Sequence, residues 1–202
     1  PIADGPVIQA ASQRALDRGV TTRAVLAAMR GFDRVPVVLM GYLNPILRFG
    51  LAGFADAAVA AGASGVIVSD LTPEESDDWV NACRDRDLDT IFLAAPTSTD
   101  ARLDEVAKRC SGFVYAVSRT GVTGAESAVP PDVTGLVERV RARTDLPVCV
   151  GFGISCPEHV RMVWQVADGA VVGSHLVRLI AESWQGGAGR EALREAVRSL
   201  KS

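Results

Sequence analysis

The chain has 202 residues, a formal net charge of −3 at pH 7, 48% hydrophobic residues and 22% charged residues. This is enough chain for one domain with a substantial core, and the slightly acidic balance gives no electrostatic basis for binding nucleic acid or an anionic membrane. No apolar run approaches the roughly 18 residues that a membrane span needs, so neither nucleic acid nor a membrane is an expected partner.

Apolar segments of strand length alternate with amphipathic helical segments along the whole chain. As far as residue 86, the pattern predicts a loop at Pro1–Pro6, helices at Val7–Arg18 and Arg23–Arg30, a strand at Val35–Met40, a loop at Gly41–Pro45, a helix at Leu51–Ala61, a strand at Gly65–Val68 and a helix at Glu74–Arg86. The elements expected after it are a strand at Thr90–Ala94, a helix at Ala101–Arg109, a strand at Gly112–Val117, a helix at Asp132–Arg143, a strand at Val148–Val150, a helix at Pro157–Val166, a strand at Gly169–Val172, and helices at His175–Trp184 and Arg190–Lys201. This alternation indicates an α/β protein with a parallel sheet and right-handed crossovers.

The strand at Gly112–Val117 carries no charge on either face, which is typical of a strand buried on both sides. It is followed by Ser118–Gly124, where two glycines and three hydroxyl side chains stand within seven residues. Such a segment is suited to a mobile loop whose N–H groups approach a ligand closely. An ordinary βα connection is the plain alternative.

The last two predicted strands end in the motifs GFGIS at 151–155 and VVGS at 171–174. Both supply backbone N–H groups just before a helix, and the loops after strands 7 and 8 of a (β/α)8 barrel often hold a phosphate in this way. We therefore expect a (β/α)8 TIM barrel, with its strands 3 to 8 and the loop after strand 2 in these 202 residues. An open flavodoxin-like sheet is the alternative.

The cysteines and histidines show no metal-binding pattern. The cysteines are Cys83, Cys110, Cys149 and Cys156. They form no CxxC pair, so we expect reduced thiols, a cytoplasmic protein and no metal site. His159 and His175 are expected to be solvent-facing helix residues.

Several motifs together resemble the tryptophan synthase α subunit family. In chain order they are PIADGPVIQAA, LMGYLNPI, SRTGVTGA, GFGIS and VVGSHLV, and the resemblance extends over essentially all 202 residues. It implies a single barrel domain over residues 1–202 and a lyase that cleaves indole-3-glycerol phosphate to indole and glyceraldehyde 3-phosphate. It also implies a tryptophan synthase β subunit as partner, in an α2β2 complex, with pyridoxal phosphate expected only in that partner and no cofactor in this chain.

The resemblance assigns roles to individual residues. It implies that Asp4 is catalytic, since a carboxylate there accepts from the indole N–H and stabilises the positive charge that develops on the ring. Thr123 would contact that aspartate and close the loop over the site. The implied phosphate-binding residues are Gly124, Gly153, Gly173 and Ser174, and the implied pocket residues are Tyr42, Tyr115 and Phe152.

Other assignments stay open at this point. Arg119 is expected to be a solvated loop residue rather than a phosphate clamp, and Asp70 either orients the loop over the site or caps the helix at Pro73. Gly41 and Thr72 depart from the family pattern, which has a larger residue and a proline there. The family's acid–base glutamate would lie before Pro1, together with the first strand, helix and second strand, so we expect these residues to be part of a longer chain.

Two other functions are compatible with the sequence. One is a different phosphosugar-processing barrel enzyme, and the other is a ligand-binding barrel that mainly activates a β partner.

Overall fold

Consecutive strands of the chain lie side by side in two parallel sheets. A computed structural model describes residues 5–32, 34–117, 130–151, 153–184 and 188–201. The first sheet has the order β1 (Val37–Gly41), β2 (Ala63–Val68), β3 (Asp89–Ile91), and the second has the order β4 (Leu93–Ala94), β5 (Val114–Val117), β6 (Val148–Gly151), β7 (Gly169–Val171). Pairing in sequence order excludes a flavodoxin-like sheet, in which the first strand lies between later ones.

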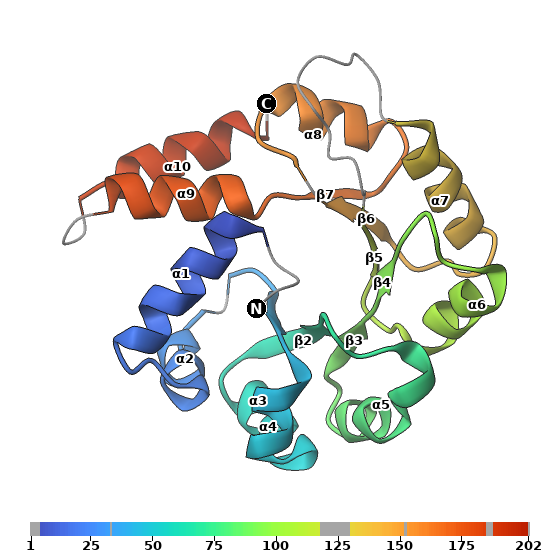
Figure 1. Cartoon of the computed structure of the whole chain (residues 1–202), viewed down its shortest axis with the longest axis horizontal. Coiled ribbons are helices and arrows are strands. Elements are labelled where there is room, and N and C mark those ends of the chain that lie inside the picture. The colour runs from blue at the N-terminus through green and yellow to red at the C-terminus, as the bar shows by residue number, and fades with distance from the viewer. Residues whose placement is uncertain (1–4, 33, 118–129, 152, 185–187, 202) are drawn as a thin grey trace.

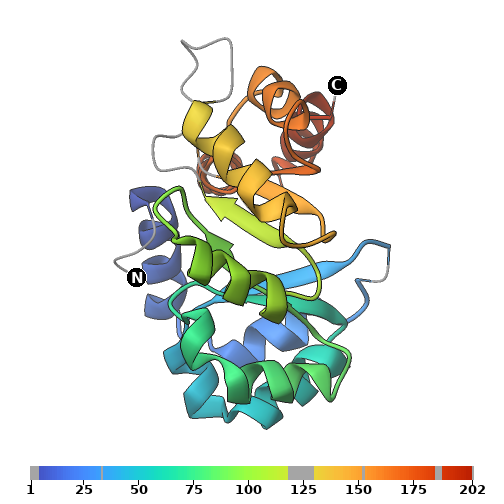
Figure 2. The same ribbon diagram turned by 90° about the vertical axis from the view of Figure 1, so that its right-hand side faces the viewer.

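The helices surround the outer side of this curved wall of strands (Figure 1). Their bounds are α1 (Pro6–Asp17), α2 (Thr22–Met29), α3 (Leu43–Phe49), α4 (Leu51–Ala60), α5 (Asp77–Arg84), α6 (Asp100–Arg109), α7 (Pro131–Arg141), α8 (Pro157–Trp164), α9 (Ser174–Ser183) and α10 (Arg190–Ser199), with a 3-10 turn, η1 (Pro73–Glu75). From the side, α6 and α7 lie across the outer face of β5 (Figure 2). In the part of the chain described, no helix has the length and apolar character that a membrane crossing requires.

The strands bury different residues on their two faces, as alternation along a strand requires. The inner face holds a small apolar cluster built around Ile67, Ile91 and Tyr115, with Val38 and Val171 packed against it. The outer face contributes Val66, Val114, Val148 and others to the main core beneath the helices. The strand residues predicted to be buried on both sides are therefore divided between a barrel interior and an outer layer.

Local sequence explains where several helices begin and end. Pro6 occupies the first turn of α1, and Gly19 follows its end with a φ of +73°, a conformation that glycine adopts without strain. At α2, the Thr21 hydroxyl accepts from the Ala24 N–H at 3.2 Å. At α6, the Thr99 hydroxyl accepts from the Arg102 N–H at 3.3 Å. These ends agree with the predicted ones within two residues.

The structure corrects the loop predicted at Gly41–Pro45. Helix α3 begins at Leu43, inside that segment, and Pro45 lies in its first turn, where a missing N–H costs no intrahelical hydrogen bond. The Asn44-Pro45 pair therefore opens a helix rather than a turn.

Two predicted elements are each divided in two. The helix expected at Glu74–Arg86 is interrupted at Ser76, whose hydroxyl donates to the Pro73 carbonyl at 2.7 Å, so that η1 precedes α5. The strand expected at Thr90–Ala94 is divided at Phe92, whose N–H donates to the Cys110 thiol at 3.2 Å. The Phe92 carbonyl still accepts from the Tyr115 N–H at 3.1 Å, which keeps β4 aligned with β5.

The expectation that His159 faces solvent was wrong. Its side chain is only 4% exposed, within α8, while His175 is half-buried at the start of α9. The His159 Nδ1 accepts from the Ser155 N–H at 3.3 Å. This hydrogen bond ties the loop after β6 to the first turn of α8.

Candidate active site

The predicted site lies at the carboxyl ends of the parallel strands, where their loops gather. Among the predicted site residues, the structure describes Tyr42, Tyr115, Gly153, Gly173 and Ser174. Asp4, Thr123, Gly124, Phe152 and Arg119 lie outside the described residues.

Tyr42 directly follows β1 and remains extended, with φ −117° and ψ 155°. Side chains alternate along such backbone, so Tyr42 belongs to the same face as Val38, which packs in the inner cluster. Tyr42 is half-buried and borders a mainly apolar cavity of about 460 Å³, which lies between α1, α2 and the outer face of the strands, since Leu39, Phe54 and Val66 of the main core line it. The strand alternation therefore assigns Tyr42 to the inner side at the carboxyl end of β1, and the cavity to the outer side.

Tyr115 lies in the inner cluster and is 8% exposed. Its ring rests on the backbone of Gly151, and a Cβ added to that glycine would lie 2.7 Å from the Tyr115 Cζ atom. Gly151 is thus the residue that makes room for the tyrosine across β6. Sequence reasoning assigned no role to Gly151, although it is the first glycine of the GFGIS motif.

Gly153 and Gly173 follow neighbouring strands at matching distances. Gly151 pairs with Val171 in the β6–β7 ladder. Gly153 lies two residues after Gly151, and Gly173 lies two residues after Val171. Gly153 has a φ of +78°, which disfavours any side chain. A Cβ at Gly173 would meet no described atom within 4 Å, so packing does not require a glycine there.

The start of α9 offers backbone donors to an anion. Gly173 is its N-cap residue, and no described side chain caps the helix. The first N–H groups of a helix have no intrahelical partner, and the helix dipole adds positive potential. Ser174 contributes an exposed hydroxyl at the first helical position. Together with Gly153, this end of the barrel has the features of a phosphate site.

Asp70 does not cap the helix at Pro73, one of the two roles considered for it. Its Oδ1 atom accepts from the Leu43 N–H at 2.7 Å, at the start of α3. Turn η1 at Pro73 begins at Thr72 with no side-chain cap among the described residues. The helix-cap role at Pro73 was therefore wrong, while the loop at 118–124, to which the other predicted role refers, lies outside the described residues. No sequence pattern links positions 43 and 70, which are 27 residues apart.

The loop after β4 is anchored from α7. Arg139 donates to the Ser98 carbonyl at 2.6 Å and to the Asp100 carboxylate at 2.8 Å. The hydrogen bond from Arg139, followed by the charges of Arg139 and Arg143, holds the pKa of Asp100 below its usual value. These contacts fix the rim of the site without placing a charge inside it.

The chemistry of the described side chains gives no sign of a metal centre. Among the residues that the structure describes, no group of three or more histidine, cysteine or acidic residues could hold a metal ion. All four cysteines are free thiols.

Comparisons with known proteins decide the family. A family model described as "Tryptophan synthase alpha chain" matches residues 1–201. The tryptophan synthase alpha chain of Desulfatibacillum aliphaticivorans is 47% identical over 205 residues, covering 100% of this chain and 77% of that protein. The alpha chain of Solibacter usitatus is 48% identical over 204 residues, covering 100% of this chain and 76% of that one.

The chain belongs to the tryptophan synthase alpha chain family.

Solved structures agree with this. A chain of the tryptophan synthase a2b2 complex of the hyperthermophile Pyrococcus furiosus superposes with a TM-score of 0.91 at 38% identity, covering 100% of this chain and 82% of that chain. The fold is therefore that of the tryptophan synthase alpha TIM barrel, as the sequence predicted. Within the described residues, β1 and β3 are the edges of the first sheet and β4 and β7 those of the second, so each of these four strands pairs on one side only.

Proposed function

We propose that this chain is a lyase of tryptophan biosynthesis that cleaves indole-3-glycerol phosphate to indole and glyceraldehyde 3-phosphate. The observation that carries the proposal is the family match over residues 1–201, with relatives at 47% and 48% identity. The site geometry supports it, because the uncapped start of α9 at the carboxyl end of β7 presents the backbone donors that a phosphate needs.

The reaction breaks the bond between indole C3 and the adjacent carbon of the glycerol phosphate chain. The bonding electrons stay with C3, which gains a proton. The hydroxyl on the adjacent carbon loses its proton as that carbon becomes the aldehyde. Positive charge develops on the ring before the bond breaks, so a carboxylate beside the indole N–H lowers the barrier.

In this proposal, Asp4 is that carboxylate and Thr123 contacts it as the loop closes. The phosphate is held by backbone N–H groups and a hydroxyl, and the indole ring by aromatic side chains. The proposed phosphate-binding residues are Gly124, Gly153, Gly173 and Ser174, and the proposed ring-binding residues are Tyr42, Tyr115 and Phe152. The open space at Gly173 supports close approach of a ligand.

We propose the tryptophan synthase β subunit as partner, in an α2β2 complex. The similarity to a chain of the P. furiosus a2b2 complex supports this. In this assembly pyridoxal phosphate is bound only by the β subunit, and the α reaction needs no cofactor. We also place the protein in the cytoplasm, which its four free cysteines support. Residues 1–202 would form one barrel domain, and the continuous core beneath the helices supports this.

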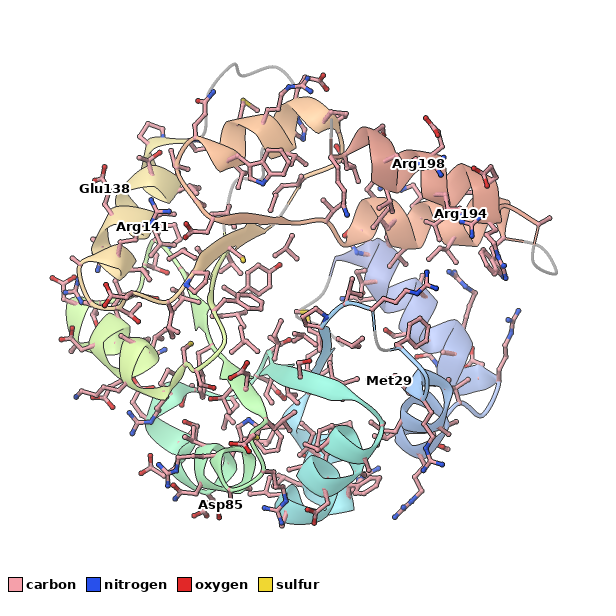
Figure 3. All side chains as sticks on the ribbon, turned by 180° about the vertical axis from the view of Figure 1, so that it is seen from behind. Met29, Asp85, Glu138, Arg141, Arg194 and Arg198 are labelled. Carbon is pink, nitrogen blue, oxygen red and sulfur yellow. The ribbon has the colours of Figure 1, made fainter. Side chains whose placement is uncertain are left out.

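The test is indole release from indole-3-glycerol phosphate by the full-length protein, with and without the β subunit. The Asp4→Asn variant is expected to lose at least about a hundredfold in kcat/KM, since it removes the charge that stabilises the ring cation. Asp85→Asn is the matched control, because Asp85 lies on the outer side of the helix ring (Figure 3).

Three results would count against the proposal. Unchanged turnover in Asp4→Asn would remove the role of Asp4. Activity on another sugar phosphate, with none on the indole substrate, would indicate a different barrel enzyme. Activation of the β subunit without any indole release would indicate an interaction subunit.

A further inference from the structure

The loops that follow β1 and β2 are joined by two hydrogen bonds. Asp70 Oδ1 accepts from the Leu43 N–H at 2.7 Å, and the Ser69 N–H donates to the Gly41 carbonyl at 2.9 Å. The first bond follows Tyr42 in the chain and the second precedes it. Tyr42 is thus held between two points that are both fixed to the loop after β2.

Helix α3 needs the Asp70 carboxylate because its own N-cap residue cannot serve. Serine, threonine or aspartate at this position would accept from an N–H of the first turn. Tyr42 occupies it, and its side chain makes no capping hydrogen bond. Asp70 replaces that missing cap from a different loop, with a charged acceptor at the positive end of the helix dipole.

The bond to Leu43 fixes the peptide unit that sets the direction of Tyr42. Leu43 packs against the main core outside the strands, whereas Tyr42 follows the inner face defined by Val38. The Leu43 N–H belongs to the peptide that joins these two residues. Holding it fixes the ψ angle of Tyr42, observed at 155°, and therefore the orientation of the backbone from which the Tyr42 side chain extends.

The Asp70 carboxylate has no competing cation in the described part of the chain. No lysine or arginine there forms an ion pair with it, in contrast to Asp56, Asp100 and Asp168, which pair with arginines. Among the described residues, the carboxylate therefore accepts the short hydrogen bond from the Leu43 N–H and forms no surface ion pair, so it holds the loop after β1.

We infer that Asp70 is a positioning residue for the lyase site, which holds Tyr42 toward the indole ring through the Leu43 peptide. The inference rests on the proposed function, since it concerns the same site. Asp70 itself touches no reacting atom; it acts through the ring contact of Tyr42.

The test compares Asp70→Ala, Asp70→Asn and the control Asp85→Ala in the full-length protein with its β subunit. Loss of a charge-assisted hydrogen bond predicts that Asp70→Ala lowers kcat/KM for indole release by about tenfold. Asp70→Asn keeps an amide oxygen that accepts from Leu43, so it should retain activity within about threefold of the parent. Asp85→Ala should match the parent.

A double-mutant cycle separates positioning from general stability. In a Tyr42→Ala background, Asp70→Ala should cost less than about twofold, because the residue through which it acts is absent. A full tenfold cost in that background would overturn the inference. So would parent-like kcat/KM in Asp70→Ala, with the loss confined to thermal stability.

Amide hydrogen exchange at Leu43 gives a readout independent of catalysis. Exchange should become at least about tenfold faster in Asp70→Ala and stay unchanged in Asp85→Ala. Unchanged exchange would overturn the inference even if activity fell. If the parent released no indole, the proposed function would fail and the inference with it; an active parent with unaltered Asp70→Ala would contradict the inference alone.

Discussion

At the scale of single residues, Gly151 and Tyr115 share one space inside the barrel. The tyrosine ring covers the glycine so closely that a Cβ at position 151 would lie 2.7 Å from Cζ of the ring. Contacts that short are relieved only by moving the ring or the strand. The size of residue 151 therefore determines where a proposed pocket residue lies.

We expect Gly151→Ala to lower the free energy of unfolding by about 1–3 kcal/mol and to lower kcat/KM for indole release. Urea unfolding and the indole assay measure the two effects. Gly135→Ala in α7 is the matched control, because a Cβ there meets no described atom within 4 Å. Alanine inside a helix should stabilise the protein by about 0.5–1 kcal/mol. Equal effects of the two substitutions would contradict the steric argument.

At the scale of elements, Asp168 joins a helix and two strands at the opposite end of the barrel. It lies just before β7, accepts from the Val148 N–H at 2.8 Å at the start of β6, and accepts from Arg141 at 2.9 Å at the end of α7. The hydrogen bond from Val148, then that from Arg141, holds the pKa of the Asp168 carboxyl below its usual value. One carboxylate thus fixes the register of neighbouring βα units.

Asp168→Ala should lower the free energy of unfolding at pH 7 by about 1–2 kcal/mol, mainly through the lost backbone bond, since the exposed ion pair contributes little. The carboxylate has a lowered pKa in the folded state. Its contribution is therefore complete above the unfolded pKa of about 3.9 and is lost as pH falls through the folded pKa. Urea unfolding at pH 7 and below pH 4 should show the gap to the parent closing in acid. A gap that is constant with pH would contradict this origin.

The prediction of elements from sequence succeeded where periodicity was clear and failed where partners were distant. The inner and outer faces of β5 follow from its alternating residues. Helix α3 was missed because Asn44-Pro45 is also typical of turns. The bond between Asp70 and Leu43 joins residues that only the fold brings together. His159 was misplaced because one polar residue in an amphipathic helix does not reveal which face it occupies. The roles of Asp4, Thr123, Gly124 and Phe152 stay predictions.

At the scale of the whole molecule, the main core runs beneath the ring of helices and contains Cys83 and Cys110. Burial raises the pKa of both thiols to about 12. At pH 8 they are therefore almost entirely protonated, and the thiolate is the reactive form. Reaction of these thiols reports opening of the core rather than local exposure.

We expect iodoacetamide at pH 8 to leave Cys83 and Cys110 unmodified in the native protein. Of the two half-buried cysteines, Cys156 should react before Cys149, because burial raises the pKa of the Cys149 thiol. Above the midpoint of urea unfolding all four cysteines should react together. Peptide mass spectrometry after timed labelling measures each site. Rapid labelling of Cys83 under native conditions would contradict a single cooperative core.

The pairing of each strand with its neighbour in sequence also governs how the molecule assembles. Every ladder in the two sheets joins strands separated by a single connection, so assembly can proceed by adding one βα unit to the last. Because each connection joins neighbouring strands, closing it costs little conformational entropy. This favours rapid folding of the sheet from a small nucleus. A backbone cut between units would leave each piece with complete strand–helix pairs, so two such pieces should reassociate through the faces they normally share.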